Sequence, residues 1–349
     1  MKRLIYSILG ICLMTSLTFA DKVESKKVFE EHFNSIQNTS LYLNNKYGDI
    51  IIANWDKDEI SIKCEIIVKA KNKKLADEFL AYITSEIGKS QDSVFAVTHF
   101  DKKFKNNSKV DIDIKYTVKA PAHLAYNINN KYGNIAISKI TGKTKINLKY
   151  GNMLAKRLEF TEHKKLNNIY LAYSNATIGY CNYADIEIKY GKIKLDRAKA
   201  LLMNSRYSDV TIGTLETLHF DGKYGGLSVD SINIAEIEVK YMNIEMQYLR
   251  TKLNTEIKYG NLEVKNIEPN FNEIDIEAAY GNVELLIHPD AVYSLSADVD
   301  YGSLDLPKRV NINKSINSNS EEVEGVVGPK GKTITGKVSI EMDYGNVEL

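Results

Sequence analysis

The segment Lys189-Tyr190-Gly191-Lys192-Ile193-Lys194-Leu195 contains a pattern that recurs along almost the whole chain. Each copy has a tyrosine, a small residue, a turn-forming residue and then alternating apolar residues. The tyrosines of the twelve copies are Tyr47, Tyr132, Tyr150, Tyr173, Tyr190, Tyr207, Tyr224, Tyr241, Tyr259, Tyr280, Tyr301 and Tyr344. From Tyr173 to Tyr241 each step is 17 residues long. Self-similarity at a short fixed period is typical of stacked units that cannot bury their apolar faces alone.

Apolar residues occupy fixed positions around each tyrosine. In the copy of Tyr190 they are Ile186, Ile188, Ile193 and Leu195. This period-two alternation on both sides of the tyrosine predicts two strands per copy. A third apolar column lies eight residues after the tyrosine: Ile140, Leu158, Cys181, Ala198, Leu215, Ile232, Leu249 and Ile267. We therefore predict an all-β fold, a β-solenoid in which each copy forms one roughly three-sided coil of about 17–21 residues.

The residues after the tyrosine predict a sharp corner. The first is mostly glycine and the second is mostly Asn or Asp, as in Gly133-Asn134. These residue types tolerate positive φ, and stacked Asn side chains can hydrogen-bond from coil to coil. A Gly-Asn pair between two strands can instead form a hairpin turn, which would give an antiparallel meander. The constant repeat length and the third apolar column favour the solenoid.

The tyrosines share their parity with the inward residues. We expect their rings to stack from coil to coil, with each hydroxyl at the wet edge of the corner. As parts of the core, such rings would cost roughly 3–5 kcal/mol when replaced by alanine. The alternative is an exposed aromatic strip that binds sugar rings or a partner surface.

The chain divides into four regions. Lys2 and Arg3, followed by an apolar stretch and Thr18-Phe19-Ala20, are typical of a secretory signal peptide over residues 1–20. Residues 21–125 read as an N-terminal entry and capping region with a first repeat. Residues 126–306 read as tandem solenoid coils, and residues 307–349 as a polar excursion with a final repeat. We therefore expect an exported protein, periplasmic or at the cell surface, with no transmembrane span in the mature chain.

One helix is expected in the entry region. Apolar residues at helical spacing predict it near residues 72–88, with Gly88 as its end. They are Leu75, Phe79, Tyr82, Ile83 and Ile87.

Composition and charge indicate no chemical site. The 46 basic and 45 acidic residues leave a net charge of +1, which argues against a nucleic-acid partner. The six histidines lack metal-ligand spacing: His32, His99, His123, His163, His219 and His288. Cys64 and Cys181 are expected to be buried free thiols. We therefore predict no catalytic residue, no cofactor and no metal site.

Two outward columns carry charge. Lys or Arg often precedes the tyrosine, and Asp or Glu often lies three residues before it, which predicts a solvated mixed-charge face. A second acidic column lies four residues after the tyrosine in the late copies: Glu245, Glu263, Glu284, Asp305 and Glu348. Whether this column binds calcium stays open, because stacked carboxylates supply suitable oxygen ligands but the dedicated loop pattern is absent.

The order of motifs resembles a known family. A Gly-Asp-Ile corner is followed by Trp55-Asp56-Lys57-Asp58-Glu59, a helix, and a strand ending at Val118-Lys119-Ala120-Pro121. The segment Asn130-Lys131-Tyr132-Gly133-Asn134-Ile135-Ala136-Ile137 comes next. Over residues 30–349 this is similar to an adhesin-like family of exported bacterial β-solenoid proteins of unknown function.

The resemblance implies a right-handed solenoid at the cell envelope and supplies no catalytic residues. We expect a non-enzymatic binding or structural protein whose partner is an envelope protein or a glycan. Edge or end-to-end self-association is also open. The alternative is a polysaccharide-active β-helix enzyme or a carbohydrate-binding module.

Overall fold

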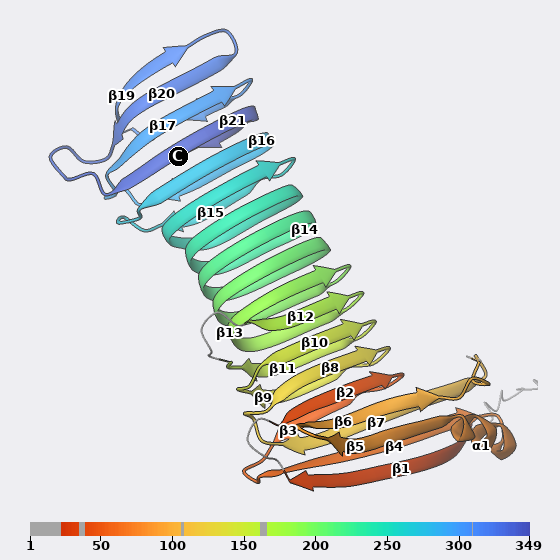
Figure 1. The fold of residues 1–349 in the computed structure, drawn as a ribbon. Coiled ribbons are helices and arrows are strands. Elements are labelled where there is room, and N and C mark those ends of the chain that lie inside the picture. The colour runs from red at the N-terminus through yellow and green to blue at the C-terminus, as the bar shows by residue number, and fades with distance from the viewer. Residues whose placement is uncertain (1–21, 35–38, 106–107, 161–165, 309) are drawn as a thin grey trace, which may run out of the picture.

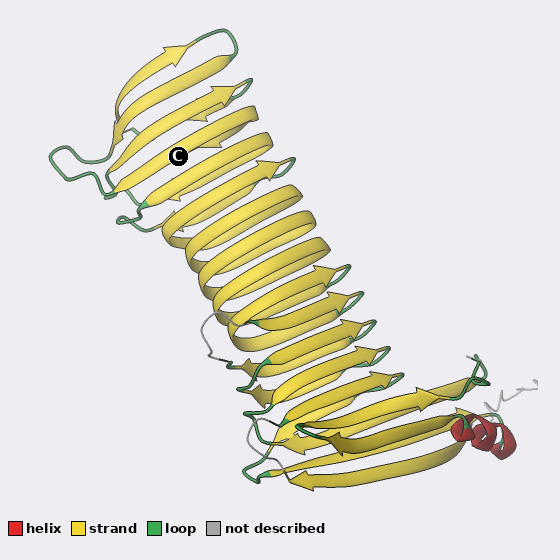
Figure 2. Ribbon diagram, viewed as in Figure 1, coloured by secondary structure: helices red, strands yellow, loops and turns green. Residues whose placement is uncertain are grey.

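The chain forms a long rod of stacked β-coils with a wider cap at its N-terminal end (Figure 1). The computed structural model describes residues 22–34, 39–105, 108–160, 166–308 and 310–349. The proposed signal peptide, residues 1–20, lies outside the described residues. Strands dominate the described chain and one short helix projects from the cap (Figure 2). The prediction of an all-β solenoid is confirmed, while its handedness stays a prediction.

The elements follow one another along the chain with few long loops. In order they are β1 (Val23–Asn34), β2 (Ser40–Lys46), β3 (Ile50–Asn54), β4 (Glu59–Ala70), α1 (Lys73–Ala81), β5 (Ile83–Ser90), β6 (Ser93–Phe100), β7 (Val110–Ala120), β8 (Ala125–Lys131), β9 (Ile135–Ile140), β10 (Thr144–Lys149), β11 (Asn152–Leu158), β12 (Asn167–Ala172), β13 (Asn175–Lys189), β14 (Lys192–Lys258), β15 (Leu262–Ile267), β16 (Glu273–Ile287), β17 (Tyr293–Asp300), β18 (Ser303–Asp305), β19 (Val310–Ile316), β20 (Ser320–Val327) and β21 (Gly336–Glu348). The long β14 runs without a break through three tyrosine corners, at Tyr207, Tyr224 and Tyr241.

The coils pair in parallel, which excludes the hairpin topology. β13 pairs with the first coil of β14 so that Ile178 faces Leu195 and Ile186 faces Met203. The strand segments on either side of Tyr190 therefore pair with the neighbouring coils and not with each other. Parallel stacking at a fixed repeat length is what the constant spacing of the tyrosines predicts.

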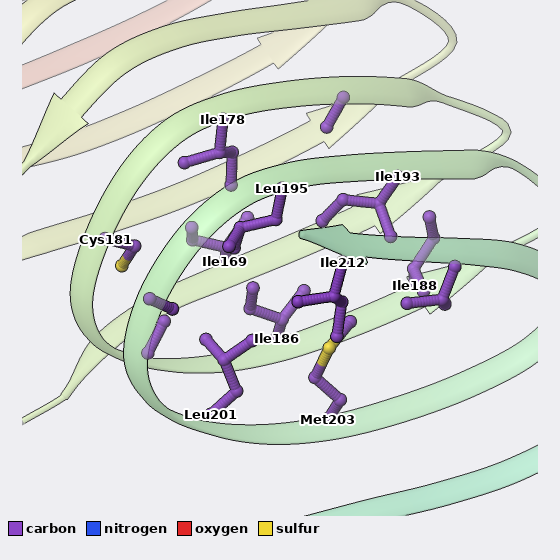
Figure 3. Close-up of a cluster of buried hydrophobic side chains, with 14 of the residues drawn as sticks. Ile169, Ile178, Cys181, Ile186, Ile188, Ile193, Leu195, Leu201, Met203 and Ile212 are labelled. Atoms are coloured by element: carbon purple, nitrogen blue, oxygen red, sulfur yellow. The ribbon is translucent and has the colours of Figure 1, made fainter. Parts of the chain in front are cut away.

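The apolar columns line the inside of the rod. Ile188 is fully buried and Ile193 is 2% exposed, as the alternation predicts. In Figure 3 these two side chains lie at one end of the coil, and Cys181 lies at the bend at the other end. Every member of the third column is buried, so this column closes the core opposite the tyrosine corner.

The N-terminal cap interrupts the repeat without disturbing the stack. The coil of Tyr47 pairs directly with the coil of Tyr132, through β2 with β8 and β3 with β9. The intervening residues add β6 and β7 to the outer edges of β2 and β3. β4 then pairs antiparallel with β7, and β1 pairs antiparallel with β4. The cap thereby covers the end of the core.

The helix is shorter than predicted. α1 is capped by Asn72, whose side chain accepts a hydrogen bond from the Leu75 N–H, and it ends at Ala81. Residues 83–90 form β5, which pairs antiparallel with β6. Ile83 and Ile87 fit a helical period and a strand period equally well, and pairing with β6 decides between them.

The C-terminal end differs from the prediction in the placement of the last copy. β21 does not follow β18 at the end of the rod, because it inserts between β16 and β17 and pairs in parallel with both. The expected polar loop instead contains β19 and β20, an antiparallel pair that extends the sheet beyond β17. A repeat pattern identifies the copies but not the order in which they stack.

No helix within the described ranges has the length and apolar content needed to cross a membrane.

Candidate functional site

The tyrosine corners share one unusual backbone conformation. All twelve repeat tyrosines have φ between 51° and 65°, in the left-handed region. The expectation that the glycines and asparagines of the corner adopt positive φ is wrong for most corners. Only Gly48 and Gly225 among the corner glycines have positive φ. A bulky residue in this region is an uncommon feature that normally reflects a specific constraint.

Glycine at the corner allows the backbones of neighbouring coils to lie close together. A Cβ on Gly191 would lie 1.9 Å from the carbonyl oxygen of Ser174 in the preceding coil. The larger residues found at this position, Ser174, Ser208 and Met242, each lie between coils that have glycine there. Two side chains therefore never face each other at this position, and at both ends of the stack glycine faces glycine.

The asparagines connect the corners, as predicted. Asn134 donates its backbone and side-chain N–H groups to Asp49 Oδ1 at 2.8 and 3.0 Å. Asn152 repeats both contacts with Asn134 Oδ1. Similar bonds join Asn243, Asn261, Asn282 and Asn346 near the other end. This row fixes the register of successive corners.

The tyrosine rings form one continuous stack. Successive ring centroids are 4.7–5.4 Å apart and the ring planes differ by 2–19°. The stack confirms the predicted coil-to-coil ladder. Tyr344 lies between Tyr280 and Tyr301, at 5.0 and 4.7 Å, because β21 inserts there. We call this row of twelve tyrosines the tyrosine edge.

The tyrosine edge lies outside the core. Its members range up to the 56% exposed Tyr301, and most are more than 40% exposed. The left-handed conformation breaks the strand alternation at the tyrosine, so its parity does not carry the ring inward as the sequence suggested. Neighbouring rings cover both faces of each inner ring, and the ring edges and hydroxyls face outward. Within the described ranges, no hydroxyl of the tyrosine edge has a hydrogen-bond partner in the protein.

The cap closes one end of the tyrosine edge. Tyr47 packs edge-to-face on Phe100 at 5.8 Å, and Phe104 lies 6.5 Å from it. Phe79 of α1 packs in turn against Phe104. These aromatic residues of the entry region occupy the outer face of the first ring.

Cations flank part of the tyrosine edge. The ammonium groups of Lys46, Lys131 and Lys223 lie 4.4, 4.8 and 5.3 Å from the centroids of the tyrosine rings that follow them. A cation close to the face of an aromatic ring is attracted by the ring quadrupole, by about 0.5–1 kcal/mol at exposed sites. The edge therefore offers phenol hydroxyls, ring edges and ammonium groups, with the asparagine row beside them.

The late acidic column is assembled in register but partly neutralised. Glu245 pairs with Glu263, which pairs with Glu284, and the row continues through Glu348 to Asp305. Lys265 Nζ lies 2.5 Å from Glu245 and 3.8 Å from Glu263, and its hydrogen bond and charge lower the pKa of Glu245. No group of three or more metal-ligating side chains in the described part of the chain is arranged to hold a metal ion.

The described histidines and cysteines do not belong to the tyrosine edge. Three histidines form surface pairs with carboxylates, namely His32 with Glu59, His99 with Glu86 and His219 with Glu236. His163 lies outside the described residues. Cys64 and Cys181 are buried free thiols, as predicted, and Cys12 lies outside the described residues. Burial raises the pKa of Cys64 to about 11 and that of Cys181 to about 12.

Comparison with solved structures found similar chains at low identity. A "putative cell adhesion protein" from Clostridium sporogenes is 12% identical, with 94% of this chain and 98% of that chain covered and a TM-score of 0.20. A "putative lipid binding protein" from Parabacteroides distasonis is 13% identical, with 74% and 95% covered and a TM-score of 0.38. A "putative adhesin" from the same species is 11% identical, with 90% and 97% covered and a TM-score of 0.26. Comparison with curated proteins found no match.

The family comparison covers most of the chain. The profile of the family described as Toastrack DUF4097 matches residues 39–349. This match confirms the resemblance inferred from the motifs. The chain belongs to the Toastrack DUF4097 family.

Proposed function

We propose that this chain is an exported, non-catalytic protein of the cell envelope that uses its tyrosine edge as a binding surface. The observation that carries the proposal is the left-handed conformation of twelve stacked tyrosines, ten of which are exposed. Its partner is a protein or glycan surface rich in hydrogen-bonding groups.

The corner conformation alone does not require tyrosine. A left-handed residue other than glycine costs about 1–2 kcal/mol, and Gly or Asn adopts this conformation most readily. A stacked aromatic pair contributes about 0.5–1.5 kcal/mol beyond its buried area. The free-energy cost of the left-handed conformation and the free energy gained by stacking are therefore similar. A tyrosine at the corner thus adds little net stability over an asparagine. Its recurrence at every corner indicates a use beyond the fold.

The arrangement of the rings selects the kind of partner. A sugar that stacks on an aromatic ring needs an open ring face, and here neighbouring rings cover the faces at centroid distances near 4.8 Å. The surface offers ring edges and hydroxyls in a regular row, flanked by ammonium and amide groups. Tyrosine is enriched at protein interfaces because it combines apolar area with a polar end. Edge-on contact with a polar surface is thus favoured over stacking with sugar rings.

The test uses residues 21–349 and a washed envelope fraction from the source cells. In the triple variant Tyr190→Asn, Tyr207→Asn and Tyr224→Asn the corners keep a residue suited to positive φ, so the fold should persist. The matched control carries asparagine at three outward positions of the same coils: Lys194, Thr211 and Ser228. Binding reduced at least tenfold in the tyrosine variant alone supports the proposal. Equal binding by both variants and the parent would overturn it.

Export and lack of catalysis are tested separately. We expect cell fractionation to recover the chain in the envelope or periplasm, with its N-terminus cut after Ala20. We also expect incubation with a polysaccharide panel to release no new reducing ends. Cytosolic recovery of the uncut chain would contradict the first expectation, and steady release of sugar fragments would contradict the second.

A further inference from the structure

The rod has uncompensated positive charge at one end of one face. We call the outward residues of the strand segments before each tyrosine the entry face. At its N-terminal end Lys46 pairs in register with Lys131, and Lys131 pairs with Lys149. Lys145 is exposed on the same face. Like charges directly opposite each other on neighbouring strands destabilise a sheet.

The same face carries uncompensated negative charge at its other end. Glu277 pairs in register with Glu341, Glu341 with Asp298, and Asp298 with Glu322. A parallel row places Asp343 beside Asp300. A shallow cavity of about 250 Å³ lies among these carboxylates, which include Glu277, Asp298 and Glu341, with Lys258 at its side toward the middle of the rod.

The middle of the entry face neutralises its own charge. Lys189 pairs with Glu187 at 2.5 Å, Arg206 with Asp221 at 2.9 Å, and Lys258 with Glu256 at 2.8 Å. Over the described residues, Lys131, Lys145 and Lys149 have no such carboxylate partner. The same holds among those residues for Glu277, Glu341 and Asp298, so the two ends differ from the middle by leaving their rows unpaired.

The order of the coils places the lysine end and the carboxylate end of the entry face at equal distances from the middle of the rod. Along the stack the first three tyrosines are Tyr47, Tyr132 and Tyr150, and the last three are Tyr280, Tyr344 and Tyr301. A two-fold axis through the entry face between the coils of Tyr207 and Tyr224 would place the first three coils of one copy opposite the last three of another. An interface of this kind is self-complementary.

We propose that two copies associate side by side and antiparallel through their entry faces, with the lysine row of each against the carboxylate rows of the other. Each contact relieves repulsion within two like-charged rows and forms pairs of opposite charge. The association is electrostatic and therefore weakens as ionic strength rises. It requires no ligand on the tyrosine edge, although Lys46 and Lys131 border both surfaces.

The test is a charge exchange measured by sedimentation velocity on residues 21–349. One variant carries Lys131→Glu, Lys145→Glu and Lys149→Glu, and the other carries Glu277→Lys, Asp298→Lys and Glu341→Lys. We expect the parent to dimerise at low salt and to dissociate at high salt. Each variant alone should dimerise at least about tenfold more weakly, since removing charge pairs raises the dissociation constant. An equimolar mixture of the two variants should dimerise again, because every contact then joins opposite charges.

The control variant replaces three lysines on the opposite face of the rod by glutamate: Lys156→Glu, Lys192→Glu and Lys194→Glu. It should dimerise like the parent. A parent that stays monomeric at every concentration and salt would overturn the proposal. So would variants that dimerise normally, or a mixture of folded variants that does not recover. Dimerisation of the parent only on addition of calcium would assign the carboxylate rows to a bound cation instead.

Discussion

At the residue scale, the tyrosine corner decides most of the surface chemistry. The ring at Tyr207 stacks on Tyr190 and Tyr224 at 5.0 and 4.7 Å but remains about half exposed. Replacing this tyrosine by alanine should therefore lower the free energy of unfolding by less than the roughly 3–5 kcal/mol expected of a core ring. We expect Tyr207→Ala to cost about 1–3 kcal/mol, from two lost stacks, and Tyr207→Phe to remain close to the parent. Tyr207→Asn should stay within about 1 kcal/mol, because relief of the left-handed strain offsets the lost stacking.

Denaturant melts measure these differences, with Ile193→Ala as the reference for a buried side chain. That reference should cost about 2–5 kcal/mol. If Tyr207→Ala proves as damaging as Ile193→Ala, the tyrosine edge is part of the core and its exposure has been misjudged.

The buried thiols give a second prediction at this scale. Cys64 and Cys181 hold their protons to about pH 11 and 12 in the fold, whereas an exposed thiol ionises near pH 9. Unfolding in this window releases protons, so the contribution of these two thiols to the free energy of unfolding should be constant below pH 9 and should fall as pH rises through the window. Native protein should also react slowly with a thiol reagent at pH 9, while the unfolded chain reacts at once. Rapid labelling of both thiols in the native state would contradict their burial.

The sequence predicts the residue pattern well and the backbone poorly. The apolar columns, the stacked rings and the asparagine row all follow from periodicity. The left-handed φ does not, because intrinsic preference assigns it to the glycine and asparagine that follow the tyrosine. At Gly191 the constraint comes from the carbonyl group of another coil, which no local pattern contains.

At the element scale, the corners depend on close backbone approach. Gly191 and Gly226 provide a matched pair, since an added Cβ would lie 1.9 Å from the Ser174 carbonyl oxygen at the first and 3.9 Å from the Asp209 side chain at the second. We expect Gly191→Ala to destabilise the fold by about 1–3 kcal/mol, as overpacking does. Gly226→Ala should be neutral within about 0.5 kcal/mol. Thermal melts compare the two, and equal losses would show that coil spacing does not require glycine at the corner.

The elements that differ from prediction do so because of pairing partners far away in sequence. Residues 83–90 pair with β6 and become a strand despite their helical spacing. The polar stretch after Pro307 contains β19 and β20 because β17 offers an open edge. Such outcomes depend on which edges are free, and a local pattern has no information about them.

At the scale of the whole molecule, charge separates along the rod because the copies differ outside their shared pattern. The inward columns repeat from end to end, while the entry face changes from lysine near Tyr132 to carboxylates near Tyr301. Periodicity therefore predicts the rod. The charge at each end of the entry face follows only from the order in which the coils stack. The tyrosine edge and the charged rows both depend on that order.

The order of the last three coils is accordingly the feature to measure. In the structure Glu277 is the register partner of Glu341, which is the partner of Asp298. Neighbouring strands lie about 4.8 Å apart and next-but-one strands about 9.6 Å apart. A disulfide needs Cα atoms closer than about 7 Å.

The measurement is disulfide formation in two double-cysteine variants under mild oxidation, read by intact mass and non-reducing gel mobility. The native thiols are buried and should not interfere. We expect Glu277→Cys with Glu341→Cys to cross-link rapidly and completely within one chain, and Glu277→Cys with Asp298→Cys to remain reduced. Rapid cross-linking of the second pair without the first would contradict the insertion of β21, and with it the stack of tyrosines described for the C-terminal end.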